Sequence, residues 1–168
     1  MVVFDASPLI VLASADRLSI LETFGSELVV PERVRTEVVD AGIAAGHPDA
    51  RRVRAAIDRG LLTAREVDRS PLFEELVALD GLSDADAAVL TYAATDDALV
   101  VMDERAGRSI VAAEGITSRG SAWIVLSRVE SGHISSREGH RAIDDLVEAG
   151  WYCSTDLYRR IVGKLEEL

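Results

Sequence analysis

Two short apolar runs, each followed directly by an aspartate, constrain the fold of this chain most strongly. Val2–Phe4 precedes Asp5, and the apolar run 98–102 precedes Asp103. Buried parallel strands read as continuous apolar runs, and open α/β sheets bind ligands outside the carboxyl ends of their strands. Neighbouring strands lie about 4.8 Å apart, so carboxylates that end two adjacent strands can share one metal ion. The sequence therefore predicts a parallel sheet with an acidic site at one edge.

Segments with strand-like and helix-like patterns alternate along the chain. Short apolar or β-branched runs predict strands at 2–4, 28–30, 61–67, 99–102 and 116–118. Apolar spacing and capping residues predict helices that begin at Ser7 and Pro31 and that cover 18–24, 48–60, 71–79, 83–94, 104–114 and 123–132. The run 61–67 is the least apolar strand, which places it near an edge of the sheet. Gly42 and Gly46 are expected to loosen the chain before the helix at 48–60.

Strands that alternate with helices predict a parallel sheet covered by helices on both faces. The expected fold is α/β, a three-layer α/β/α sandwich, followed by a C-terminal helical pair at 135–149 and 155–168. We expect one domain over residues 1–168, divided into a core at 1–130 and a helical extension at 131–168.

Aromatic residues and the single cysteine of the extension carry simple expectations. Trp151 and Tyr152 are expected to fill the junction between the last two helices rather than to stack on bases. Cys153 is expected to be a small buried apolar residue. As the only cysteine, it excludes an intrachain disulfide and a cysteine-based zinc site.

Composition excludes some cellular settings and one mode of nucleic-acid binding. The sequence contains no run near the roughly 18 apolar residues of a membrane span and no signal-like start, so a cytoplasmic protein without membrane contact is expected. The 29 acidic and 18 basic residues give a formal net charge of −11. A negative net charge opposes binding to nucleic acid through overall charge attraction. Binding RNA would need metal ions or a local patch, for which Arg105, Arg108 and Arg119 are well placed near the strand ends.

Position singles out four of the many carboxylates. Asp5 and Asp103 end the two most apolar strands, Glu37 lies on the first turns of the helix after the second strand, and Asp86 lies in the first turn of the helix before the fourth strand. Four carboxylates that meet repel one another, and a divalent cation removes that cost. Oxygen ligands of this kind suit Mg²⁺ or Mn²⁺, and such ions can activate water for phosphodiester cleavage.

Other polar residues near these positions leave alternatives open. Asp84 rivals Asp86, and Glu104 can contribute beside Asp103. Ser7 either caps the first helix or helps to orient Asp5 and a metal-bound water. Each of the four carboxylates could also be an ordinary cap, turn or surface residue.

The acidic motifs resemble, in order and spacing, those of PIN-domain nucleases over residues 2 to about 130. The motifs are Asp5-Ala6-Ser7-Pro8, the segment 31–39 around Glu37, Asp86-Ala87, and Val101-Met102-Asp103-Glu104. The segment 148–158 also resembles a longer prokaryotic PIN-like subfamily. The chain departs from many PIN nucleases in one respect: Met102 stands where they carry Thr or Ser before the fourth acid.

This resemblance implies a central parallel sheet and a metal-dependent ribonuclease. Carried over by motif, Asp5, Glu37, Asp86 and Asp103 are the acidic ligands of Mg²⁺ or Mn²⁺, and Ser7 is a polar helper. Many prokaryotic members are VapC-like toxins, neutralised by a small antitoxin, and many are homodimers. The resemblance thus implies an endonuclease for single-stranded RNA, with an antitoxin protein and a second copy of the chain as partners.

Three other functions fit the sequence less well. Phosphoacceptor aspartates need a lysine near the phosphoryl group, whereas the single lysine, Lys164, lies near the C-terminus. A nucleotide-binding Rossmann protein needs a Gly-x-Gly-x-x-Gly motif after the first strand, which is absent. A catalytically silent PIN-like module that binds RNA or protein remains the main alternative, although all four acids are present.

Overall fold

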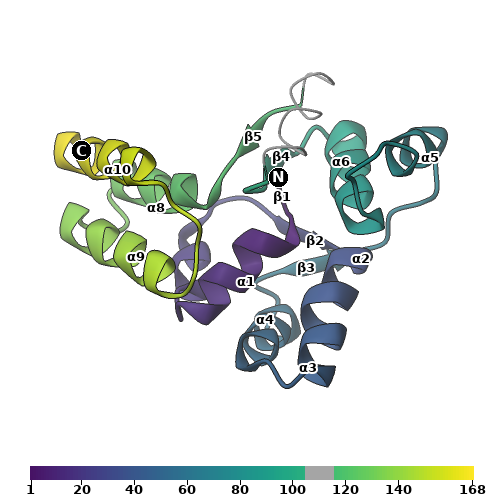
Figure 1. Cartoon of the computed structure of the whole chain (residues 1–168), viewed down its shortest axis with the longest axis horizontal. Coiled ribbons are helices and arrows are strands. Elements are labelled where there is room, and N and C mark those ends of the chain that lie inside the picture. The colour runs from purple at the N-terminus through teal and green to yellow at the C-terminus, as the bar shows by residue number, and fades with distance from the viewer. Residues whose placement is uncertain (105–115) are drawn as a thin grey trace.

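The protein is built on a parallel sheet of five strands in the order β3-β2-β1-β4-β5 (Figure 1). The computed structural model describes residues 1–104 and 116–168. The strands are β1 (Val2–Phe4), β2 (Leu28–Pro31), β3 (Thr63–Arg65), β4 (Leu99–Val101) and β5 (Ser118–Arg119). The expected helix at 104–114, with Arg105 and Arg108, falls almost wholly outside the described residues.

Helices connect these strands and follow the last one. Between the strands lie α1 (Ala6–Ser14), the 3₁₀ helix η1 (Leu18–Thr23), α2 (Glu32–Arg35), the π-helical η2 (Thr36–Ala41), α3 (Gly42–Ala44), α4 (Pro48–Asp58), α5 (Pro71–Val77) and α6 (Asp84–Asp96). After β5 come α8 (Ser121–Glu130), α9 (Ser136–Glu148) and α10 (Thr155–Glu167). In the described part of the chain, no helix combines the length and the apolar character that crossing a membrane requires.

Helices cover the sheet on two sides. On one side α1 contacts α4, η1 and α9, and α8 contacts η1. On the other side α6 lies against β1, β2 and β4 and is backed by α5 (Figure 1). The predicted three-layer α/β/α sandwich is therefore confirmed.

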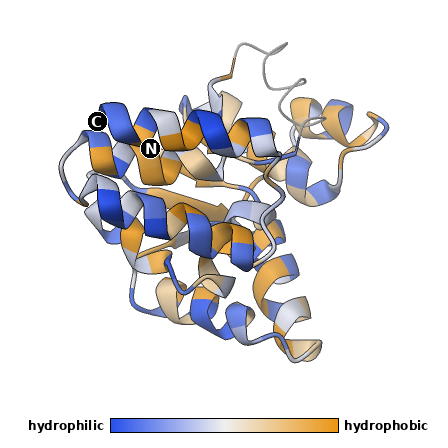
Figure 2. Ribbon diagram, turned by 60° about the vertical axis from the view of Figure 1, so that its left-hand side comes forward, coloured by the Kyte–Doolittle hydropathy of each residue, from blue (hydrophilic) through white to orange (hydrophobic). Residues whose placement is uncertain are grey.

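One continuous apolar cluster joins the sheet to the C-terminal helices. It runs from Val3 and Phe4 of β1 to Ile143 of α9 and to Ile161 and Leu165 of α10. Figure 2 shows apolar strands at the centre and hydrophilic residues along the outer faces of the helices. The C-terminal helical pair is thus packed into the same core as the sheet.

The pairing of β1 with β4 sets the position of the acidic residues. Phe4 is in register with Val101, and the backbone N–H of Asp5 donates to the carbonyl of Val101 at 3.0 Å. After β1 the chain forms β2 and β3 on one side of β1, and it then forms β4 and β5 on the other side. The strand order therefore reverses between β1 and β4. In open α/β sheets, ligands bind at such a reversal, outside the carboxyl ends of the strands.

The structure corrects the expected boundaries of two strands and the role of Gly42. The third strand covers only Thr63–Arg65, at the predicted edge, and the fifth is shifted to Ser118–Arg119. Gly42 does not loosen the chain, because the helix continues through it to Ala44. A Cβ at Gly42 would lie 2.7 Å from the Cβ of Ala50. The glycine therefore permits the close approach of α3 and α4.

Two glycines in helices are expected to respond to alanine in opposite ways. Gly42→Ala should lower the melting temperature, because relieving the clash with Ala50 must move backbone, an overpacking cost of about 1–3 kcal/mol that outweighs the gain in helix propensity. Gly163→Ala in α10, where a Cβ meets nothing within 4 Å, should raise stability by about 0.5–1 kcal/mol. Thermal melts of both variants check this. Stabilisation by Gly42→Ala would contradict the packing argument.

Candidate functional site

Asp5 is the buried centre of the acidic cluster. It follows β1 directly, occupies the N-cap position of α1 without making a side-chain capping hydrogen bond, and is only 5% exposed. Burial raises the pKa of Asp5 to about 7, and the nearby backbone N–H of Ala6 offsets part of that rise. A carboxyl group in this position is poised between its protonated and ionised forms at neutral pH.

The other three predicted carboxylates lie near enough to act on Asp5. After burial, the negative charges of Asp86, Glu37 and Asp103, in that order, raise the pKa of Asp5 further. In residues 1–104 and 116–168, no group of three or more His, Cys, Asp or Glu side chains has the geometry of an assembled metal site. The four carboxylates therefore meet at Coulombic range around Asp5 without forming a finished ligand set.

Asp103 is held by hydrogen bonds from two segments that follow it in the chain. Its Oδ1 accepts from the backbone N–H of Ser121 at 2.8 Å. Its Oδ2 accepts from the Ser121 hydroxyl at 2.6 Å and from the indole Nε1 of Trp151 at 3.1 Å. Met102 is fully buried in the core and offers no hydroxyl, and the hydroxyl that contacts Asp103 belongs to Ser121.

These contacts restrict how Asp103 can act. An ionised carboxylate has about four lone-pair positions, two on each oxygen. Oδ2 already accepts two hydrogen bonds and Oδ1 accepts one, so Oδ1 keeps the capacity for a further partner. Sequence reasoning missed both donors. Ser121 could have been found by the rule that identified Asp103, because it comes just after the end of β5, the neighbour of β4.

Asp86 serves as a helix cap as well as a nearby charge. At the start of α6, Oδ2 of Asp86 accepts from the backbone N–H and hydroxyl of Ser83 at 2.8 and 2.7 Å, while the Ser83 hydroxyl accepts from the Asp86 N–H at 3.1 Å. This capping box fixes a carboxylate that is only 9% exposed. Asp84 is exposed and is not among the charges that shift the pKa of Asp5. The structure thus brings Asp86, rather than Asp84, into the cluster.

Glu37 follows β2, which borders β1 on the side away from β4, and it lies on an irregular helix. It is in the first turn of η2, a π-helical segment within the run from α2 to α3. π-Helical segments are rare in proteins, and those that occur are often found at functional sites. Its side chain is exposed, so it can change rotamer more freely than Asp5 or Asp86.

Three adjoining cavities form what we term the strand-end groove. The Ser83 cavity, of about 700 Å³, and the Ser14 cavity, of about 450 Å³, share Glu37 as a lining residue. The Trp151 cavity, of about 480 Å³, shares Ile10 with the Ser14 cavity and is also lined by Ser7 and Asp103. The groove therefore passes three of the predicted site residues: Glu37, Ser7 and Asp103.

Two expectations for the segment before α10 were wrong. Trp151 is half-buried and donates to Asp103, but Tyr152 is 89% exposed and does not fill the helical junction. Cys153 is partly exposed rather than buried. The residues 150–154 form the connection between α9 and α10, so their side chains alternate between the protein and solvent instead of facing one core.

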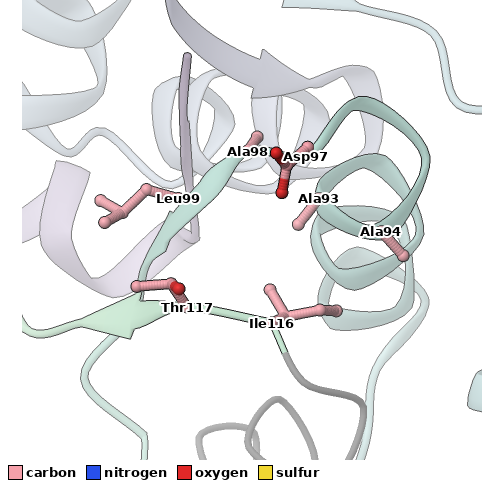
Figure 3. A pocket seen from close by; sticks show the side chains of 7 residues that line it. All are labelled: Ala93, Ala94, Asp97, Ala98, Leu99, Ile116 and Thr117. Atoms are coloured by element: carbon pink, nitrogen blue, oxygen red, sulfur yellow. The ribbon is translucent and has the colours of Figure 1, made fainter.

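A further cavity lies at the other end of the strands. This cavity, of about 380 Å³, is lined by residues at the C-terminal end of α6 and before β4 and β5, including Leu99 and Thr117 (Figure 3). Asp97 is the only carboxylate among its seven lining residues. It shares no residue with the acidic cluster and offers no comparable chemistry.

The donor set of the cluster fits a hard divalent cation. All four charged side chains offer oxygen, and the cluster as described includes no cysteine or histidine, which suits Mg²⁺ or Mn²⁺ better than zinc. In the described part of the chain, no side-chain donor hydrogen-bonds the carboxylate of Asp5, and Oδ1 of Asp103 retains acceptor capacity. Burial is the main cause of the raised pKa of Asp5, and repulsion from its three neighbours adds to it; a cation near Asp5 would turn that repulsion into attraction.

The raised pKa of Asp5 predicts a pH-dependent stability. Between about pH 4 and pH 7, the folded protein holds a proton on Asp5 that the unfolded chain releases, so metal-free stability falls as pH rises through this window. Asn cannot ionise, so Asp5→Asn should match the wild type near pH 4 and melt at a higher temperature near pH 8. A shift of about three units corresponds to a free-energy difference on the order of 4 kcal/mol.

Thermal melts in EDTA across this pH range test the expectation. Asp84→Asn provides the matched control, because Asp84 is an exposed acid close to the same cluster. A difference between wild type and Asp5→Asn that stays constant with pH would show that Asp5 is not protonated in the folded protein.

Comparisons with known proteins agree with this architecture. The family model DUF3368, described as a PIN domain, matches residues 1–167. A solved structure of a PilT N-terminus domain protein from the hyperthermophilic archaeon Sulfolobus solfataricus P2 is similar in fold, with a TM-score of 0.53 and 15% identity, over 77% of this chain and 93% of that chain. No curated protein matches the chain. The family match spans nearly the whole sequence, and the chain therefore belongs to the PIN-domain family.

Proposed function

We propose that this protein is a Mg²⁺- or Mn²⁺-dependent endonuclease that cleaves single-stranded RNA. One observation carries the proposal: Asp5 and Asp103 end adjacent parallel strands where the strand order reverses, and the charges of Asp86 and Glu37 reach the same buried carboxyl group. The PIN domain is generally a nuclease fold, and PIN domains typically use divalent metals.

Each acidic residue has a distinct part in this proposal. Asp5 and Asp103 would hold the principal ion, with Asp103 held in place by Ser121 and Trp151. Asp86, fixed by its capping box, and the more mobile side chain of Glu37 would complete the site or position the attacking water. When bound, the ion would supply the activated water and stabilise the leaving oxygen. Ser7 would assist as a polar neighbour on the wall of the groove.

The proposal extends to two protein partners. We infer a role as the toxin of a toxin–antitoxin pair, with a small antitoxin that covers the strand-end groove, and a homodimeric assembly. Support for both comes from the resemblance of the acidic motifs to those of PIN-domain nucleases, because many prokaryotic members of that family are VapC-like toxins and many are homodimers. The main alternative, a PIN-like module that binds RNA or protein without cleaving it, differs in having no metal-dependent cleavage.

Cleavage assays separate these two functions. With Mn²⁺ and single-stranded RNA, Asp5→Asn and Asp86→Asn should each cleave at least about 100-fold more slowly than the wild type, because each removes a charge from the ion site. Asp84→Asn, two residues from Asp86 but outside the cluster, should keep near-wild-type activity. Equal cleavage by wild type and Asp5→Asn would reject the nuclease site.

Metal binding can be observed without activity through the indole that touches Asp103. Mn²⁺ is paramagnetic, so its binding beside Asp103 should quench the fluorescence of Trp151. Trp123, on α8, packs against Phe24 and not against Asp103, so Trp123→Phe should keep most of this quenching. Trp151→Phe and Asp103→Asn should lose most of it. Quenching that persists in Asp103→Asn would place the ion away from this carboxylate.

A further inference from the structure

The Trp151 cavity combines a proposed metal-binding carboxylate with an exposed aromatic side chain. Its walls come from Ser7 and Ile10 of α1, from Asp103 and Glu104 after β4, and from Trp151 and Tyr152 between α9 and α10. Its volume of about 480 Å³ lies within the range of small-ligand sites. A group bound there would lie directly beside Asp103.

Within residues 1–104 and 116–168, Tyr152 makes no side-chain hydrogen bond and does not pack against the core cluster. It is 89% exposed, although it is one of only eight aromatic residues counted as Phe, Trp and Tyr. Ile10, which lines the same cavity, is also an exposed apolar side chain at 39%. An exposed aromatic ring and an aliphatic side chain in one cavity are suited to a flat, apolar-faced group such as a nucleobase.

The net charge of the chain makes contacts to bases useful for binding a nucleic-acid strand. The chain has a formal net charge of −11, and the cavity itself carries the carboxylates Asp103 and Glu104. Of the described arginines near the groove, Arg35 is paired with Glu32 and Asp40, and Arg33 donates to the Val67 carbonyl. Arg119, at the end of β5, is exposed and can meet a phosphate. The negative net charge nevertheless opposes bulk attraction of a strand, so base stacking would add useful affinity.

We propose that the Trp151 cavity is a base-binding subsite, in which Tyr152 stacks on an unpaired base that flanks the cleaved phosphodiester bond. An ionised carboxylate accepts hydrogen bonds but donates none. The exposed carboxylate of Glu104 therefore suits a base with an exocyclic amino group, such as cytosine or adenine. It suits uracil less well, because the single N–H donor of uracil lies between two carbonyl oxygens that repel a carboxylate. This subsite rests on the proposed function, since it names the part of the RNA that the same site recognises.

Binding is best measured in an Asp5→Asn parent, which should bind RNA without cleaving it. Adding Tyr152→Ala should weaken binding of a short fluorescent oligocytidine about 5- to 100-fold, the range for loss of one stacked base, whereas Tyr152→Phe should retain the affinity. Tyr158→Ala is the matched aromatic control, because Tyr158 hydrogen-bonds Asp144 and does not line the cavity. The high exposure of Tyr152 predicts that all Tyr152 variants melt like their parent.

A single abasic nucleotide beside the cleaved bond tests the pairing of base and side chain directly. The abasic position should weaken binding to the parent about as much as Tyr152→Ala does. When the abasic RNA is bound by the Tyr152→Ala variant, the affinity should be little lower than with either change alone. Fully additive losses would overturn the subsite, and equal affinity for oligouridine and oligocytidine would overturn the role of Glu104. Failure of the parent to bind any single-stranded RNA would instead reject the proposed function, and the subsite with it.

Discussion

The parallel pairing of β1 with β4 is the constraint on which the rest of the site depends. The hydrogen bond from Asp5 N–H to the Val101 carbonyl, together with the Phe4–Val101 register, sets the offset between the ends of the two strands. Because the strand order reverses between β1 and β4, these strand ends lie at the position where open α/β sheets bind ligands. A slip of two residues in this register would shift Asp103 relative to Asp5 by about 6–7 Å along the strands, or two strand rises.

The C-terminal helices belong to the site as much as to the core. Trp151 donates to Asp103 from the connection between α9 and α10, and Arg17 near α1 binds Asp145 of α9. Ile161 and Leu165 of α10 belong to the same apolar cluster as the strands. The segment expected to be a simple extension therefore orients a carboxylate at the strand ends, and truncating it would disturb the site as well as the packing.

Much of this arrangement could be predicted from the sequence, because local patterns determine it. Apolar runs located the strands, Ser83 marked the start of α6, and the residues after β1 and β4 pointed to Asp5 and Asp103. The partners of Asp103 were harder to predict, because Ser121 and Trp151 lie far from it in the chain and their contacts depend on tertiary packing. The exposure of Tyr152 could not be foreseen, since a short connection between helices lacks the periodicity that assigns side chains to a face. The continuous helix through Gly42 depends on the position of Ala50, which no local pattern records.

The buried carboxyl of Asp5 links the stability of the fold to the chemistry at its edge. Burial and three neighbouring carboxylates raise the pKa of Asp5 to about 7, so ionising this group costs the folded protein free energy that the packed sheet must offset. The same repulsion makes the cluster attractive to a divalent cation, because a bound ion would neutralise charges that otherwise oppose one another. A proton and a cation therefore compete for one carboxyl group. Occupancy by the cation should consequently increase as pH rises through the pKa of Asp5, which couples the onset of metal binding to neutral pH.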